Sequence, residues 1–327
     1  MKTMTSKKKA LKLAGAIVVV GSLLAACSGT GKDDDATKDN AKDLTYAVIT
    51  HSSSGDAFWD RVKSGAEKAG DDYGVSVEYS SDPDPAKQSQ LIDGAVADKV
   101  NGIVVSMANP DGLEDSIKAA VAAGVPVVTI NSGVDKFKEF GAITHIGQTE
   151  TIAGEAVGER LKSEGLKNGI CVIQEAGNIG LEERCNAVAD TFGGTMTNLQ
   201  VDGTDDSAVQ ATITSKLQAE TGIDVVLTLG GQYAIDAVGS IEESGSSAKV
   251  ATFDLSEDVI KDIQSDKILF AVDQQPYVQG FLGVTTLYLK DINGNDVGGG
   301  QPVNSGPAFI TKENADAVLK FAANGTR

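Results

Sequence analysis

The stretch HSSSGDAFWD, which runs from His51 to Asp60, places an acidic residue just before two aromatic rings. Asp56 supplies carboxylate oxygens that accept hydrogen bonds, while Phe58 and Trp59 supply apolar ring faces. A polyol needs both, because its hydroxyls bind planar polar side chains and its C–H faces pack against an aromatic ring. The stretch therefore indicates the binding of a neutral hydroxylated molecule.

Similar polar side chains occur in other short segments that follow apolar runs. Asn131 opens the segment NSG, Asp254 lies in FDLSED, and Arg184 ends QEAGNIGLEER. Ligands of open α/β sheets bind outside the carboxyl ends of the strands, so segments in these places are the ones to search. Carboxylates, amides and a guanidinium can each hold a pair of neighbouring hydroxyls.

Each of these residues also has a purely structural interpretation. Asp56 could cap the helix that follows it, alone or in addition to binding, and Phe58 could belong only to the core. Arg184 could pair on the surface with Glu182 or Glu183, and Asp254 could cap the helix beginning at Glu257. Asn131 could serve only as a turn residue.

Signatures of catalysis are missing. No GxGxxG follows a strand, and neither GxxxxGK[ST] nor GxSxG occurs, so nucleotide-phosphate and serine-hydrolase sites have no support. With only two histidines, a metal site is not expected. We expect no enzyme activity, no catalytic residue, no cofactor and no metal.

Short runs rich in β-branched residues alternate with segments of helical period, which indicates parallel sheets covered by helices. The strands expected in the first half are Tyr46–Thr50, Val75–Tyr79, Gly102–Ser106 and Pro126–Ile130, and the helices are Phe58–Tyr73, Ala86–Asp98 and Gly112–Ala123. After THIGQTE the alternation restarts, with strands expected at Ile170–Gln174, Thr197–Val201, Val225–Thr228, Val250–Phe253 and Leu269–Val272. The matching helices are Ile152–Ser163, Leu181–Phe192, Ser207–Glu220, Tyr233–Glu243 and Glu257–Ser265, with a further helix at Pro276–Lys290.

The pattern predicts an α/β protein of two doubly wound parallel-sheet lobes. Crossing strands are expected at Thr144–Gly147, Asp273–Gln275 and Gly300–Val303, where three hinge strands would join the lobes. The first lobe would comprise residues 44–145 plus 276–300, and the second residues 146–273 plus 303–323.

The amino-terminal segment has the features of a secretion signal. A lysine-rich start, a short apolar run and small residues precede Cys27, within residues 1–27. The sequence LLAAC resembles the bacterial lipobox, in which the cysteine is acylated and becomes the mature amino terminus. An ordinary signal with an incidental cysteine is the alternative. Residues 28–43 lack large apolar side chains, so we expect a flexible tether.

The net charge of the chain restricts its possible partners. Removing the five leader lysines from 28 basic residues leaves 23 against 46 acidic ones, a formal charge of −23. This charge disfavours nucleic acid and anionic membrane surfaces as partners.

Outside the cytoplasm Cys171 and Cys185 are expected to form a disulfide, the alternative being two reduced core thiols.

Taken together, these segments resemble the ribose- and galactose-binding family of bacterial solute-binding proteins, which have the type I periplasmic binding protein fold. The resemblance runs from Leu44 to about Val318 and depends on the order of GDAFWDRVKSGAE, DPAKQSQLIDGAVADKVNGIVVS, AAGVPVVTINSG, GLEERCNA, VATFD and AVDQQP. It implies that the ligand is held by Asp56, Phe58, Trp59, Ser106, Asn131, Asn178, Arg184, Asp254 and Gln274. Secondary candidates are His51, Ser52 and Gln232.

The sequence departs from the family pattern in three places. Gly230 and Gly231 stand where the family often has a polar contact, which is then missing or passes to Gln232. No second aromatic residue lies near DGTDD, and Asn131 with Ser132 replaces an acid–arginine pair. These departures affect the identity of the ligand more than its class.

The resemblance implies an extracytoplasmic binding protein that closes on a hexose, deoxyhexose or related polyol and delivers it to an ABC permease. We expect a monomer, lipid-anchored to the outer face of the cytoplasmic membrane through Cys27. The alternatives are an inositol, nucleoside or furanose-signal binding protein, and a sensor that reports occupancy to a signalling receptor.

Overall fold

The computed structural model describes residues 43–53 and 55–327, which form two six-stranded sheets. The expected leader (residues 1–27), the lipid attachment at Cys27 and the tether up to residue 42 lie outside the described residues. Within the described part, no helix is long and apolar enough to cross a membrane.

The first sheet has the strand order β11-β5-β4-β3-β1-β2, and every neighbouring pair is parallel. Its strands are β1 (Thr45–Thr50), β2 (Ser76–Ser81), β3 (Gly102–Ser106), β4 (Val127–Ile130), β5 (His145–Gly147) and β11 (Val303–Asn304). The helices around it are α2 (Ala57–Tyr73), α3 (Pro85–Ala97), α4 (Glu114–Ala122), α5 (Phe137–Phe140) and α11 (Pro276–Asn293), and η1 (Val297–Gly300) precedes β11.

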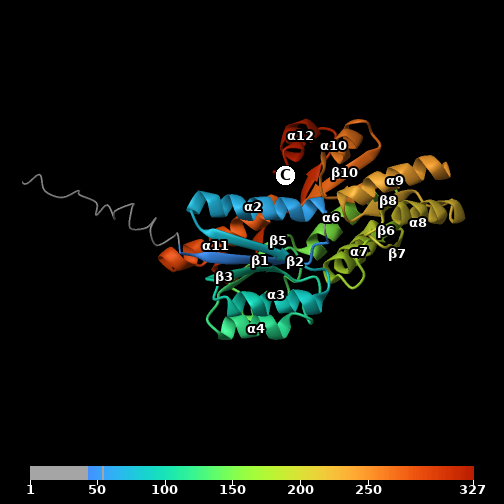
Figure 1. Cartoon of the computed structure of the whole chain (residues 1–327). Helices are drawn as coiled ribbons and strands as arrows, with labels where there is room; N and C mark the ends of the chain where they lie inside the picture. Colours follow the sequence, from blue (N-terminus) through green and yellow to red (C-terminus); the bar gives the residue numbers. More distant parts are fainter. Residues whose placement is uncertain (1–42, 54) are drawn as a thin grey trace, which may run out of the picture.

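The first sheet is covered on both faces. All residues of β3 and β4 are buried, as expected for parallel strands between two helix layers. One apolar cluster packs α2 and α11 against the sheet, and the other packs α3, α4 and α5 against the opposite face. Figure 1 shows α2 on one side of β1 and β3, with α3 and α4 on the other.

The second sheet has the order β12-β10-β9-β8-β6-β7, and its strands are parallel except β12, which is antiparallel to β10. Its strands are β6 (Asn168–Ile173), β7 (Thr195–Gln200), β8 (Val225–Thr228), β9 (Lys249–Phe253), β10 (Ile268–Asp273) and β12 (Ala308–Ile310). Its helices are α6 (Glu150–Ser163), α7 (Ile179–Phe192), α8 (Asp206–Ala219), α9 (Gly231–Ser244), α10 (Glu257–Gln264) and α12 (Ala315–Ala323). Helices α6 and α7 cover one face, while α8, α9, α10 and α12 cover the other.

The fold is therefore the expected pair of parallel-sheet α/β lobes, but the lobe boundaries need correction. Residues 146–147 in β5 and residues 303–304 in β11 were assigned to the second lobe, yet these strands pair with each other in the first sheet. Ile146 and Val303 also pack in the apolar cluster of the first lobe. Edge pairing satisfies their backbone groups there, so the chain crosses after Gly147, after Asp273 and after Asn304.

Candidate binding site between the lobes

The carboxyl ends of the two sheets meet, and loops of the two lobes are in direct contact. The N–H of Ile179, at the start of α7, donates to the carbonyl oxygen of Ala108 after β3, at 3.1 Å. A second contact joins the amide of Asn131, after β4, to the side chain of Gln274, after β10. The structure therefore has its lobes closed on each other.

Asp56 lies at the first-lobe side of this junction, as the cap of α2. Its Oδ1 accepts from the N–H of Phe58 at 2.8 Å, so the capping interpretation holds. Burial raises the pKa of the Asp56 carboxyl, the Phe58 N–H opposes that shift, and the charge of Glu175 across the junction adds to it. Capping occupies one oxygen, which leaves the other able to bind.

The two aromatic residues differ in environment. The Trp59 ring is buried in the first-lobe core, whereas Phe58 is half-buried. The Trp59 ring meets the edges of both neighbours, with centroid distances of 4.6 Å to His51 and 4.9 Å to Phe58. Phe58 is therefore the ring with surface left for a ligand, and Trp59 supports it from behind.

His51 and Ser106 form one buried unit at the ends of β1 and β3. Ser106 Oγ accepts from the backbone N–H of His51 at 3.1 Å and lies 2.7 Å from His51 Nδ1. If the hydroxyl donates to Nδ1, Nε2–H points toward Glu175, whose carboxylate is 3.9 Å away. Burial lowers the pKa of His51, which favours the neutral ring. The nearby Ser52 hydroxyl donates to the carbonyl of Ser53.

Three polar side chains link the lobes in a chain of hydrogen bonds. Asn131 Nδ2 donates to Gln274 Oε1 at 3.2 Å, and Gln274 Nε2 donates to Asp254 Oδ1 at 2.8 Å. Asn131 and Asp254 both have left-handed backbone conformations, with φ of 63° and 67°. Such conformations are tolerated best by Asn, Asp and Gly, so the turn role of Asn131 coexists with its side-chain contact.

Asp254 does not cap α10, because Ser256 takes that position and accepts from the N–H of Val259. The carboxyl is instead directed to the junction, where burial raises its pKa to about 7. The positive charge of Arg184 and the hydrogen bond from Gln274 partly oppose this shift.

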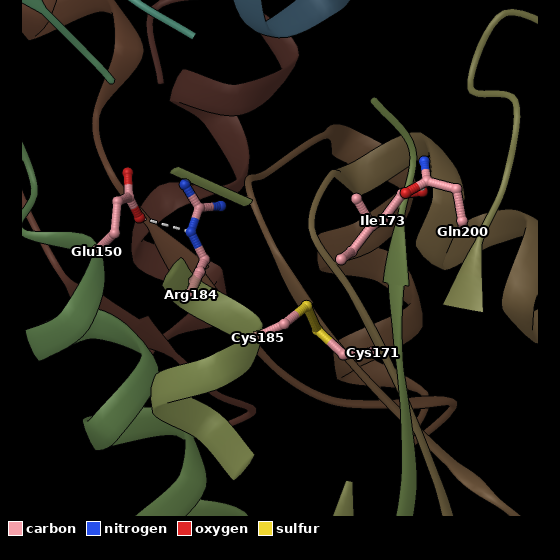
Figure 2. Close-up of a disulfide and its surroundings, with 6 residues drawn as sticks. All are labelled: Glu150, Cys171, Ile173, Arg184, Cys185 and Gln200. Carbon is pink, nitrogen blue, oxygen red and sulfur yellow. Dashed lines mark hydrogen bonds and ion pairs between the residues drawn. A yellow bond between two sulfur atoms is a disulfide. The ribbon is translucent and has the colours of Figure 1, made fainter. Parts of the chain in front are cut away.

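Arg184, on α7, is 3% exposed, and its side chain contacts the start of α6 and the end of β9 in the second lobe. Its Nε donates to Glu150 Oε2 at 2.6 Å (Figure 2). Its guanidinium lies over the Phe253 ring, at 4.5 Å from the centroid. The surface pairing with Glu182 or Glu183 does not occur. Its Nη1 is buried and has no hydrogen-bond partner in the described chain.

Asn178 caps α7, with its Oδ1 accepting from the N–H of Gly180 at 3.0 Å and its Nδ2 donating to Glu175 at 2.8 Å. Gln232 is exposed on α9, and its amide reaches Asp236 along the same helix at 3.4 Å. Hydrogen bonds therefore join His51 to Ser106 and link Asn131, Gln274 and Asp254, whereas Gln232 reaches only its own helix.

Sequence reasoning missed three residues of the junction, Glu150, Glu175 and Tyr233. The Tyr233 hydroxyl donates to the carbonyl of Gly203, in the segment where no aromatic residue was found. Burial raises the pKa of Tyr233, and the charges of Asp56 and Glu175 add to that shift. Glu175 and Tyr233 each follow closely after a strand of the second sheet, a position that could have identified them.

The chemistry of this junction is that of binding. Buried acceptors, a guanidinium with a free N–H and a half-buried ring converge from both lobes. Among the described residues, no group of three or more His, Cys, Asp or Glu side chains is arranged to hold a metal ion.

Comparisons with known proteins identify the family and the fold. The family described as periplasmic binding protein domain matches residues 46–294. A carbohydrate transporter from Acidothermus cellulolyticus, solved in complex with myo-inositol, is 47% identical with a TM-score of 0.86, covering 87% of this chain and 99% of that one. The xylose/arabinose-binding protein of Sulfolobus acidocaldarius is 25% identical over 70% of this chain and 61% of its own length. The ribose import binding protein of Haemophilus influenzae is 25% identical over 70% and 80% of the two chains.

Proposed function

This chain belongs to the periplasmic binding protein domain family, and we propose that it captures a neutral polyol of monosaccharide size between its lobes for an ABC importer. The observation that carries the proposal is that hydrogen-bond donors and acceptors from both lobes face the same junction. Arg184 Nη1 is a buried donor without a partner among residues 43–53 and 55–327, and Asp56 and Asp254 are acceptors on opposite lobes. A hydroxyl that both donates and accepts satisfies such a set, because buried polar groups need partners.

Within this class myo-inositol is the first candidate. The 47% identical carbohydrate transporter was solved with that molecule bound, and the relatives named for pentoses are far less similar. An inositol ring has a hydroxyl on every carbon, which suits a junction with acceptors on both sides. Hexoses and deoxyhexoses are the next candidates, followed by nucleosides and furanose signals.

Binding would work by closure of the hinge. The hydrogen bond from Ile179 to Ala108 joins a loop of each lobe, away from the crossing segments, so it exists only while the lobes touch. A ligand that contacts both lobes binds the closed form better than the open one, so it shifts the population toward closure. The closed form is then what the permease would recognise.

The wider arrangement follows from the same proposal. Acylation of Cys27 would hold a monomer at the outer face of the cytoplasmic membrane, and residues 28–43 would act as its tether. Anchoring raises the effective concentration of the binder near its permease. A sensor role would need a signalling receptor in place of the permease, and co-purification of the ligand-bound chain with either partner separates the two.

The test is thermal unfolding of the full chain with a panel of inositols, hexoses, deoxyhexoses, pentoses and nucleosides. Ligand at 100 times its dissociation constant should stabilise the fold by about 2.7 kcal/mol, a shift of several degrees. The shift should disappear in Arg184→Ala and remain in Arg160→Ala, whose side chain pairs with Glu164 near the far end of α6. A flat response to every polyol would overturn the proposal.

A further inference from the structure

The disulfide joins the sheet of the second lobe to the helix that carries Arg184. Cys171 lies within β6 and Cys185 within α7, their Cα atoms are 5.9 Å apart, and both side chains are buried. Cys185 follows Arg184 directly in the chain, as Figure 2 shows. The covalent bond therefore holds α7 to the sheet at the helical turn from which the guanidinium projects.

Helix α6 restrains the same turn from the other side. Gly154 has no side chain, and a Cβ there would lie 2.4 Å from the carbonyl oxygen of Arg184, so the two helix backbones are in contact. Glu150, one turn earlier on α6, is the residue that pairs with Arg184 Nε. The turn is thus held between a covalent bond to β6 and close packing against α6.

This double restraint matters because the guanidinium of Arg184 lies at the end of a long side chain, far from the helix backbone. A side-chain end at about 6 Å from a helix axis moves by roughly 1 Å when the helix rotates by about 10°. Binding groups need placement within about 0.5 Å. The core around the cysteines contains other apolar residues of α7, including Leu181 and Val188. The helix can therefore stay packed without the bond, and only the contact with α6 is then left to limit its rotation.

We propose that Cys171 and Cys185 are positioning residues for ligand binding, whose disulfide sets the rotation of α7 and thereby directs Arg184 into the junction. This rests on the proposed function, because Arg184 must contact the ligand. Loss of the bond then weakens binding in a chain that remains folded, and the oxidation state of this one pair controls how well the binder retains its ligand.

The test measures myo-inositol binding by calorimetry with the full chain, at a temperature well below unfolding. In Cys171→Ala/Cys185→Ala the dissociation constant should rise roughly 3- to 30-fold. The matched control is Leu217→Ala, which opens a cavity on the opposite face of the same sheet and should lower the melting temperature without changing the dissociation constant. If the double alanine variant does not fold, the variant Cys171→Val/Cys185→Ala, which retains more of the core volume, is measured in its place.

A second measurement separates positioning from a general loosening of the lobe. In an Arg184→Lys background, removing the disulfide should change the dissociation constant less than twofold, because the group being positioned is already altered. In an Asp56→Asn background, removing the disulfide should raise the dissociation constant as much as it does in the wild type, since residues that do not share a contact act additively.

The outcomes are distinct. An unchanged dissociation constant in the cysteine variant, or the same loss in the Arg184→Lys background, overturns the positioning role while the proposed function stands. Absence of binding to any polyol by the wild-type chain overturns the proposed function itself, and this inference with it.

Discussion

Asp254 is the residue of the junction whose charge depends on its neighbours, and Arg184 is the cation closest to this effect. They come from different elements of the second lobe, and the charge of Arg184 opposes the effect of burial on the pKa of Asp254. Arg184 already has a buried anionic partner in Glu150, so Asp254 receives only part of its stabilising charge. Because burial outweighs the charge of Arg184, the pKa of Asp254 is about 7, and its carboxyl changes protonation state near neutral pH.

The raised pKa of Asp254 has a consequence for stability. Its ordinary value is 3.8 and its value in the fold is about 7, so between these the folded chain keeps a proton that the unfolded chain has released. The contribution of this group to the free energy of unfolding therefore falls as pH rises through that window, by at most about 1.4 kcal/mol per pH unit.

Asp254→Asn should remove this contribution. Urea unfolding at pH 5 and pH 7.5 should show the wild type losing more stability with rising pH than the variant does. Equal losses in the two chains would mean that Asp254 titrates normally in the fold.

Arg184→Ala should destabilise the fold as well as abolish binding. Without the guanidinium, the nearly fully buried Glu150 loses its cationic partner, and breaking a buried pair in this way costs about 3–5 kcal/mol. The double variant Arg184→Ala/Glu150→Gln should recover part of that loss, because the remaining partner is then uncharged. A single variant as stable as wild type by urea unfolding would contradict the buried pair.

At the scale of elements, the approach of α2 to α11 positions the first-lobe half of the site. These helices pack closely because each carries a glycine against the backbone of the other helix. A Cβ on Gly65 would lie 2.0 Å from the carbonyl oxygen of Tyr277, and one on Gly280 would lie 1.9 Å from that of Val62. The rings of Tyr73 and Tyr288 stack farther along the seam, with centroids 4.3 Å apart. Since Asp56 is the N-cap of α2 and Phe58 lies in its first turn, this packing sets where the two side chains lie.

Gly280→Ala should force α2 and α11 apart and lower the free energy of unfolding by about 1–3 kcal/mol or more. The matched control is Gly94→Ala on α3, where a Cβ meets nothing within 4 Å. That variant should gain up to about 1 kcal/mol, because alanine is the better helix former. Similar effects of the two variants in urea unfolding would refute the close approach.

At the scale of the whole molecule, polar contacts between the lobes hold the closed arrangement, among them the hydrogen bond from Arg61 Nε on α2 to the carbonyl of Arg327 after α12. Another is the backbone hydrogen bond from Ile179 to Ala108, and a third is the amide pair of Asn131 and Gln274. A ligand that contacts both lobes adds to these contacts only in the closed form, so it favours closure. The amide of Ile179 reports directly on closure, because its acceptor belongs to the other lobe.

Hydrogen exchange should therefore slow at Ile179 when polyol is added. At 100 times the dissociation constant its protection should rise by up to about a hundredfold. The amide of Asp98, which donates to Gly94 within the end of α3, opens by local fraying and should keep its rate. Unchanged exchange at Ile179 with a bound ligand would show that binding does not close the lobes.

The sequence by itself determined the order of the elements and the class of the fold. The strands Gly102–Ser106 and Val225–Thr228 have the expected bounds, because a buried β-branched run is defined by residues next to each other in the chain. The same local pattern placed Asn131 and Asp254 after strands of the two sheets. Short elements without a clear period, such as α5 and β12, were not predicted.

Only the tertiary structure decided which partners these residues have. Arg184 pairs with Glu150 of another helix and not with its neighbours Glu182 and Glu183, and β11 joins the first sheet because β5 offers it an edge. Tyr233 reaches a loop that contains no aromatic residue of its own. These contacts join segments far apart in the chain, so they depend on how helices and sheets pack, which local periodicity does not specify.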